Sequence, residues 1–251
     1  MEKFNPVVIL PTYHNERTLM DVARRVRAGG WPCIIVDDGC QDRTPLVIRD
    51  LQAEAKRDGG PSITTVKHTQ NLGKAAALMT GFAEAQVQGY SHAVTVDTDG
   101  QHDPEEIPRL MEAAKANPDA LVLGERAAQV EGGTPWKSLI GRKFSNGLIQ
   151  FGGGLKVTDS QTGFRVYPVT MAQVLHCRVQ RFGFETEILV RLGRAGGRVV
   201  RVPITSRYFP KELRVSHFRP WLDSLRWIRM HVNLTGEKIA FWNKGPAWPV
   251  K

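Results

Sequence analysis

Acidic side chains gather at three places where a short apolar run of the sequence ends. Such runs, bounded by polar residues, are typical of buried parallel strands. The carboxyl ends of parallel strands meet at one edge of a sheet, so we expect these side chains to share a crevice there. The groups are Asp37 with Asp38, Asp97 with Asp99, and Glu125 beside Arg126.

Asp97 and Asp99 stand two residues apart in the run Val-Asp-Thr-Asp-Gly-Gln. Two carboxylates at that spacing in an extended loop are costly to bury unless a cation neutralises them. Oxygen donors from Asp97, Asp99 and Gln101 suit Mg²⁺ or Mn²⁺ bridged to phosphate groups, and they do not suit zinc. The spacing alone also permits a plainer interpretation, in which Asp103 caps the next helix and the two aspartates lie solvated in a loop.

The elements that must position these residues follow from the hydrophobic pattern. The first half of the chain alternates short apolar runs with longer amphipathic stretches, which is typical of βαβ units around a mostly parallel, doubly wound sheet with helices on both faces. After residue 125 the rhythm weakens. We predict strands over 7–10, 33–36, 63–66, 92–96, 120–123 and 199–204, and helices over about 16–27, 44–57, 74–88, 169–177 and 185–194, with a further one from Pro104 onward.

Charge is distributed unevenly along the 251 residues. Residues 1–125 hold 13 basic and 18 acidic side chains, whereas residues 126–251 hold 21 basic and 7 acidic ones. The second half should therefore face an anionic partner, such as a phosphorylated substrate, a lipid surface or nucleic acid. With 41% hydrophobic residues the composition is that of a globular protein, which excludes collagen-like and disordered classes.

A basic amphipathic helix is predicted near the C-terminus. Phe218, Trp221, Leu222, Leu225 and Ile228 recur on one helical face, with arginines between them. Tryptophan at headgroup depth and arginine against anionic lipid would hold such a helix on a membrane surface, although the same stripe could instead cover the sheet. Because tryptophan and arginine gather on one helix rather than over a groove, we expect no nucleic-acid partner.

The cellular location expected from the sequence is the cytoplasm, on the inner face of the cytoplasmic membrane. No apolar stretch approaches the ~20 residues of a membrane span, and no secretory leader is visible. Cys33, Cys40 and Cys177 lack the spacing of a disulfide framework or a zinc site, which favours reduced thiols.

Six segments of the sequence, in their order, resemble the family 2 glycosyltransferases of the GT-A fold. Within that family they are most similar to the polyprenyl-phosphate sugar transferases, such as the dolichyl-phosphate mannose synthases. The resemblance implies a GT-A, Rossmann-like catalytic domain over residues 1–215, and the amphipathic pattern predicts a membrane-associating helix and tail over 216–251. The segments are VVILPTYHNE, IIVDDGCQDRT, NLGKAAALMTGFAEA, VTVDTDGQHDPEEIPRL, VLGER and DSQTGFRVYP.

The resemblance also implies roles for single residues. Arg142 and Ser145 would contact the acceptor, and Gln101 would join the two aspartates in holding Mg²⁺ or Mn²⁺ against the donor diphosphate. His217 stands where the family often has a lysine, and a neutral imidazole is a weaker phosphate ligand than an ammonium. The donor would be bound by Pro11, Tyr13, Glu16, Val36, Asp38, Asp97, Thr98, Asp99, Arg126, Arg207 and His217. Catalysis would rest on Asp97, Asp99, Asp159 and Arg126.

An inverting, metal-dependent glycosyltransferase is the function that the resemblance implies. It would move a sugar from a nucleotide diphosphate sugar, GDP-mannose or a UDP-hexose, to a lipid-linked acceptor, first of all a polyprenyl phosphate. An ionised phosphate needs no general base, whereas a hydroxyl of a glycolipid would need one, for which Asp159, Glu185 and Glu187 are candidates. An anionic membrane surface is an expected partner, and a membrane protein or a second copy of the chain is a further candidate.

Other function classes fit the sequence less well. A strand that ends Asp-x-Asp-Gly also begins the haloacid dehalogenase phosphatases, but there it is the first core strand, whereas three βα units precede Asp97 here. The first βα turn, residues 11–16, contains neither the dinucleotide-binding nor the P-loop glycine pattern. A nucleotide-sugar-binding protein without catalysis is the alternative from a different class.

Overall fold

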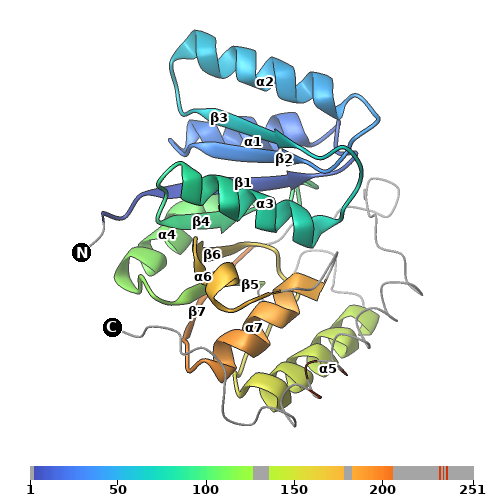
Figure 1. Cartoon of the computed structure of the whole chain (residues 1–251), viewed down its shortest axis with the longest axis vertical. Coiled ribbons are helices and arrows are strands. Elements are labelled where there is room, and N and C mark those ends of the chain that lie inside the picture. The colour runs from blue at the N-terminus through green and yellow to red at the C-terminus, as the bar shows by residue number, and fades with distance from the viewer. Residues whose placement is uncertain are drawn as a thin grey trace.

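The computed structural model describes residues 3–126, 136–177 and 183–205, together with Val232, Leu234 and Gly236, and of residues 136–142 only the backbone. Seven strands of this part of the chain form one sheet in the order β3-β2-β1-β4-β6-β5-β7 (Figure 1). The strands are β1 (Pro6–Thr12), β2 (Cys33–Asp37), β3 (Ile63–Lys67), β4 (His92–Thr95), β5 (Leu121–Arg126), β6 (Arg165–Pro168) and β7 (Val199–Ile204).

Helices cover both faces of the sheet. Successive residues of a strand point to opposite faces, so Val7 and Ile9 of β1 pack under α3 and α7, whereas Val8 and Leu10 pack under α1, α2 and α4. The helices are α1 (Leu19–Ala28), α2 (Thr44–Asp58), α3 (Lys74–Val87), α4 (Ile107–Ala116), α5 (Trp136–Gly153), α6 (Met171–Val174) and α7 (Phe184–Arg194). The predicted α/β class with helices on both faces is confirmed.

Strand β6 departs from the parallel arrangement. It lies between β4 and β5 and is antiparallel to both, with Arg165 beside Thr95 and Pro168 beside His92. This register places the start of β6 at the carboxyl end of β4. The loop that precedes β6, residues 159–164, is thereby brought to the edge of the sheet where the acidic residues were predicted to meet.

Several predicted element boundaries were wrong. The segment 158–165 was predicted as a loop throughout, and β6 was missed because four residues that begin with arginine and end with proline carry no strand pattern. Helix α5 was also missed, and the helix predicted over 169–177 has only the four residues of α6. The helix predicted from Pro104 begins with a 3-10 turn over Pro104–Glu106 before α4.

None of the helices in the described ranges combines the length and the apolar composition that crossing a membrane requires. The predicted amphipathic helix around residues 218–228 and nearly all of the predicted second segment, 216–251, lie outside the described residues.

The close contact between α3 and β1 can be tested at Gly81. A Cβ at this position would lie 2.6 Å from Ile9 Cγ2 in the core, whereas a Cβ at Gly147, within α5, would meet nothing within 4 Å. Gly81→Ala should lower the free energy of unfolding by about 1–3 kcal/mol through overpacking. Gly147→Ala, the matched control, should raise it by up to about 1 kcal/mol through helix propensity. Urea unfolding measures both, and a Gly81→Ala protein as stable as Gly147→Ala would contradict this packing.

Candidate active site

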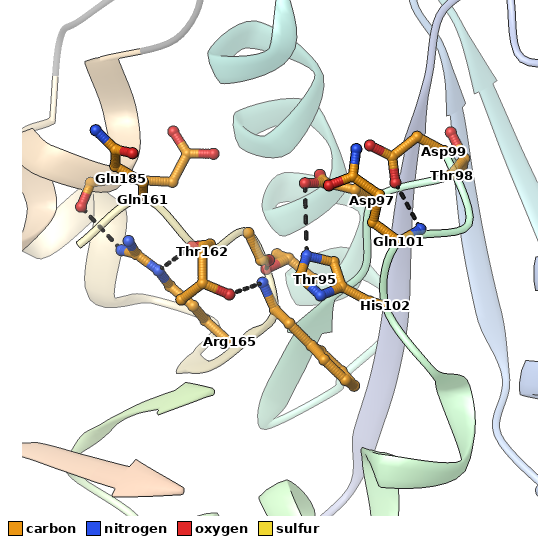
Figure 2. A network of polar contacts seen from close by, with 12 residues as sticks. Thr95, Asp97, Thr98, Asp99, Gln101, His102, Gln161, Thr162, Arg165 and Glu185 are labelled. Atoms are coloured by element: carbon orange, nitrogen blue, oxygen red, sulfur yellow. Dashed lines mark hydrogen bonds and ion pairs between the residues drawn. The ribbon is translucent and has the colours of Figure 1, made fainter. Parts of the chain in front are cut away.

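The turn that follows β4 carries Asp97, Asp99 and Gln101 at the carboxyl edge of the sheet. The backbone nitrogen of Gln101 donates to Asp99 Oδ1 at 3.0 Å, which closes the turn. Figure 2 shows the three side chains together on this turn. The structure thus brings together the residues that were predicted to hold a metal ion.

The donor set of this turn fits a hard divalent cation. It consists of two carboxylates and one amide, and oxygen donors of this kind are the ligands that Mg²⁺ and Mn²⁺ prefer. Among the residues that the structure describes, no group of three or more His, Cys, Asp or Glu side chains could hold a metal ion. A metal ion bound to Asp97, Asp99 and Gln101 would therefore need further ligands, such as water or phosphate oxygens, which is the common situation for Mg²⁺.

Thr98, between the two aspartates, anchors the turn to the fold. Its buried hydroxyl accepts a hydrogen bond from Asn15 Nδ2 at 2.7 Å and donates to the carbonyl oxygen of Pro11 at 3.1 Å. The hydroxyl of Thr18 donates to the carbonyl oxygen of Thr98 at 2.5 Å. The side chain of Thr98, which was predicted to bind the donor, is thus engaged inside the protein and holds the turn against the end of β1.

Lys74 connects two carboxylates of this edge. Its ammonium lies 2.6 Å from Asp97 Oδ1 and 2.8 Å from Glu185 Oε1. Burial disfavours the charged form of Lys74, but the attraction of the two carboxylates outweighs burial and raises the pKa of the ammonium. The pKa of Asp97 is correspondingly lowered, because Lys74 outweighs the effect of burial on that carboxyl. Both groups are therefore charged near neutral pH.

His102 completes the surroundings of Asp97 on the other side. Its Nε2 lies 3.9 Å from Asp97 Oδ2, and the imidazole is buried against Phe164 (Figure 2). Burial lowers the pKa of His102 to about 4 in spite of the neighbouring carboxylate. The imidazole is thus neutral near pH 7 and does not compete with Lys74 as the counter-ion of Asp97.

The loop before β6 lies directly on the pair of Lys74 and Asp97. A Cβ at Gly163 would lie 2.5 Å from Asp97 Oδ2 and 2.8 Å from Lys74 Nζ, so any larger residue here would displace this pair. The hydroxyl of Thr95 donates to the carbonyl oxygen of Gly163 at 2.6 Å and fixes this approach. The turn that carries Asp97 and the loop before β6 therefore meet at this contact.

Arg126 and Asp159, both predicted to act in catalysis, form a two-pronged ion pair. Arg126 Nε lies 2.6 Å from Asp159 Oδ2, and Arg126 Nη2 lies 2.8 Å from Asp159 Oδ1. Asp159 is buried, and such bidentate pairs are among the strongest that side chains make. A proton-abstracting role for Asp159 would compete with this pair.

Arg165 was not predicted as a site residue, yet it organises the loop. Its side chain is fully buried and donates to three backbone carbonyl oxygens, those of Ser160, Thr162 and Glu185, each at 2.8 Å. Figure 2 shows the bonds to Thr162 and Glu185. The guanidinium thereby joins the loop that carries Asp159 to the first turn of α7. A single basic residue inside the otherwise apolar run Phe-Arg-Val-Tyr-Pro is the sequence signal that could have indicated a buried role.

Asp38 also has a structural task at the neighbouring strand end. Its carboxylate accepts hydrogen bonds from the backbone nitrogens of Leu72 and Gly73, each at 2.8 Å, and lies 2.8 Å from His68 Nδ1. Gly73 has a φ of 95° and precedes Lys74, the first residue of α3. Asp38, predicted to bind the nucleotide, therefore sets the turn that delivers Lys74 to Asp97.

The remaining donor residues lie at the ends of β1 and β2. Tyr13 stacks on His14 with ring centroids 4.0 Å apart, and Glu16 Oε2 accepts from the backbone nitrogen of Arg43 at 2.9 Å. Pro11 and Val36 are buried, and the side chain of Val36 lies in the core beneath α3, so only its backbone could contact a ligand. These residues lie at the carboxyl edge of the sheet.

The predicted acceptor residues are described in part. Ser145 of α5 is buried and accepts a hydrogen bond from the hydroxyl of Ser160 at 3.0 Å. Glu187, a candidate base, is buried and paired with Arg191 at 2.7 Å. The side chain of Arg142 and the whole of Arg207 and His217 lie outside the described residues.

The buried role of Arg165 makes a stability prediction. Arg165→Met should remove the donors of three buried carbonyl groups and lower the free energy of unfolding by about 2–4 kcal/mol. Arg201→Met provides a matched control, because Arg201 is an exposed arginine in strand β7 and its replacement should change stability by less than about 0.5 kcal/mol. Guanidinium chloride unfolding distinguishes the two, and equal small effects would argue against the carbonyl contacts.

Comparisons with known proteins agree with this geometry. Residues 7–181 match the family model described as Glycosyl transferase family 2. The chain is 32% identical over 223 residues to a polyprenol monophosphomannose synthase of Mycolicibacterium smegmatis, covering 84% of this chain and 79% of that protein. It is 29% identical over 212 residues to an undecaprenyl-phosphate mannosyltransferase of Micrococcus luteus, covering 79% and 82%.

Solved structures share the fold. A mannosyltransferase from Pyrobaculum calidifontis in complex with GDP-Man and Mn²⁺ superposes with a TM-score of 0.61 at 18% identity, over 96% of this chain and 66% of that one. A mannosyl-3-phosphoglycerate synthase from Rubrobacter xylanophilus gives a TM-score of 0.61 at 15% identity, over 92% and 73%. These likenesses confirm the predicted GT-A architecture. By its match to the family model and to these relatives, the chain belongs to glycosyl transferase family 2 and is a glycosyltransferase.

Proposed function

We propose that this glycosyltransferase transfers a sugar from a nucleotide diphosphate sugar to the phosphate of a polyprenyl phosphate. One observation carries the proposal: two relatives that match about four fifths of the chain are named polyprenol monophosphomannose synthase and undecaprenyl-phosphate mannosyltransferase. A third relative, from Methanococcus voltae, is named UDP-N-acetylglucosamine–dolichyl-phosphate N-acetylglucosaminyltransferase and is 28% identical over 80% of this chain. The donor is GDP-mannose or a UDP-hexose.

The donor side of the reaction would be served by the turn after β4. Asp97, Asp99 and Gln101 would hold Mg²⁺ or Mn²⁺, the latter being the ion in the Pyrobaculum enzyme of the same fold. The ion, when bound, would offset the negative charge that develops on the leaving diphosphate. Tyr13 and Glu16, at the end of β1, would line the nucleotide pocket.

The acceptor would attack the sugar from the side opposite the leaving diphosphate, with inversion. The three candidate bases are each paired with a cation, Asp159 with Arg126, Glu185 with Lys74 and Glu187 with Arg191. An attacking hydroxyl would have to pass its proton to a carboxylate that is already engaged in such a pair. An ionised phosphate needs no proton acceptor, so the pairing supports a phosphate acceptor over a glycolipid hydroxyl.

The location that suits a lipid acceptor is the inner face of the cytoplasmic membrane. The net charge of +14 in residues 126–251 would attract this part of the chain to anionic lipid. We propose that the segment 216–251 makes this contact through the tryptophans and arginines of its amphipathic pattern.

The metal site can be tested by transfer assays with GDP- and UDP-sugars and a polyprenyl phosphate. Asp99→Asn keeps the size of the side chain but removes a charged ligand, and it should lower transfer by about 10²–10³-fold. Asp50→Asn, at an exposed position of α2, is the matched control and should leave transfer unchanged. EDTA should abolish turnover and Mg²⁺ or Mn²⁺ should restore it. Turnover that persists in EDTA would refute the metal mechanism.

The membrane contact can be tested by flotation with phospholipid vesicles. The double variant Arg226→Glu/Arg229→Glu should bind anionic vesicles at least about tenfold more weakly than the unmodified protein, because each basic residue near the surface contributes about 1 kcal/mol. Neutral vesicles serve as the control and should bind both proteins weakly. Equal binding of the unmodified protein to neutral and anionic vesicles would rule out the electrostatic contact.

A further inference from the structure

Lys74 is the first residue of α3, and its ammonium lies between carboxylates from two other parts of the fold. Asp97 comes from the turn after β4, and Glu185 comes from the first turn of α7. The distances of 2.6 Å to Asp97 and 2.8 Å to Glu185 are those of charge-assisted hydrogen bonds. The ammonium is therefore bound to Asp97 Oδ1, one of the two carboxylate oxygens of the aspartate that begins the Asp-Thr-Asp motif.

The surroundings leave this ammonium little room to move. Gly163 lies against it so closely that a single added carbon would come within 2.8 Å of Nζ. Gly163 is itself held through Thr95, and the backbone of Glu185 is held by Arg165. The turn before Lys74 is fixed by the carboxylate of Asp38. The side chain of Lys74 is only 19% exposed. Several parts of the fold therefore hold the ammonium in place.

A fixed positive charge beside Asp97 affects any second cation at the same carboxylate. The ammonium partly neutralises Asp97 and repels a divalent ion placed on the remaining oxygen, and this repulsion is strong because the site is partly screened from water. A diphosphate at the site would add negative charge and further oxygen ligands, and it would offset the repulsion. Metal binding should therefore be weak in the free protein and strong together with the nucleotide.

We propose that Lys74 is a positioning residue that makes metal binding depend on the donor. It holds Asp97 through one oxygen and keeps the affinity of the free protein for divalent metal low, so that the metal ion and the nucleotide diphosphate bind together. Glu185 takes part by holding the ammonium from the opposite side. The inference rests on the proposed metal site at Asp97, Asp99 and Gln101.

The test measures Mn²⁺ binding, through the electron paramagnetic resonance signal of free Mn²⁺, with and without GDP or UDP. Lys74→Met removes the charge at similar length and should bind Mn²⁺ without nucleotide at least about tenfold more tightly than the unmodified protein. The gain in Mn²⁺ affinity on adding nucleotide should shrink by a similar factor. Lys74→Arg keeps the positive charge, so its Mn²⁺ binding with and without nucleotide should match that of the unmodified protein. Lys115→Met, an exposed change of the same charge in the last turn of α4, should have no effect.

Glu185→Gln tests the same charge from the other side. It leaves the ammonium of Lys74 less neutralised, so Mn²⁺ should bind the nucleotide-free variant more weakly than it binds the unmodified protein. This opposite response keeps the inference testable if Lys74→Met is too unstable to purify. Circular dichroism and thermal unfolding establish that each variant is folded before the titration.

The outcomes separate the inference from the function on which it rests. Tighter nucleotide-free Mn²⁺ binding by Lys74→Met, with no change in Lys115→Met, supports the role of Lys74. Nucleotide-dependent Mn²⁺ binding by the unmodified protein that is the same in Lys74→Met overturns that role and leaves the metal site intact. No Mn²⁺ binding by any form, even with GDP or UDP, overturns both the role of Lys74 and the proposed metal site.

Discussion

Each charged group that is buried at the carboxyl edge of the sheet must contact an opposite charge or a set of hydrogen-bonding groups. Otherwise the free-energy cost of its desolvation is not offset. Asp97 meets Lys74, Asp159 meets Arg126, and Arg165 meets three carbonyl oxygens. These partners come from different segments. The pairing requirement therefore joins α3, the turn after β4, the loop before β6 and the start of α7 into one structure.

The reversed strand β6 makes this assembly possible. In a purely parallel sheet, the loop before a strand lies at the amino edge, away from the ends of the other strands. Because β6 is antiparallel to β4, the loop over 159–164 lies instead beside the turn that carries Asp97. Glycine at position 163 then leaves room for the side chains of Lys74 and Asp97 directly beside this loop.

Such a site suits the chemistry of glycosyltransferases. Departure of a diphosphate from a sugar needs positive charge at the leaving group, and fixed charges act most strongly where water is limited. The described residues include carboxylates and an amide that would hold a metal ion. They also include cations, which hold the neighbouring carboxylates. The acidic first half of the sequence supplies the strand ends of the sheet, and the basic second half supplies the charge that a phosphorylated lipid and its membrane would meet.

The sequence by itself determined the fold class, the first five strands and the last one, the gathering of Asp38, Asp97 and Arg126 at one sheet edge, and the family. It could do so because strand and helix periodicities are local, and because the strand ends of a parallel sheet share an edge.

Only the tertiary structure decided which charged side chains pair with one another. Lys74 and Arg165 were not recognised as site residues, although the first residue of a helix in a βα unit always lies at that edge. The pairs Lys74–Asp97 and Arg126–Asp159 join residues 23 and 33 positions apart. The antiparallel β6, whose preceding loop carries Asp159, has no local pattern of its own. Such contacts depend on how distant segments pack, and no local spacing encodes that packing.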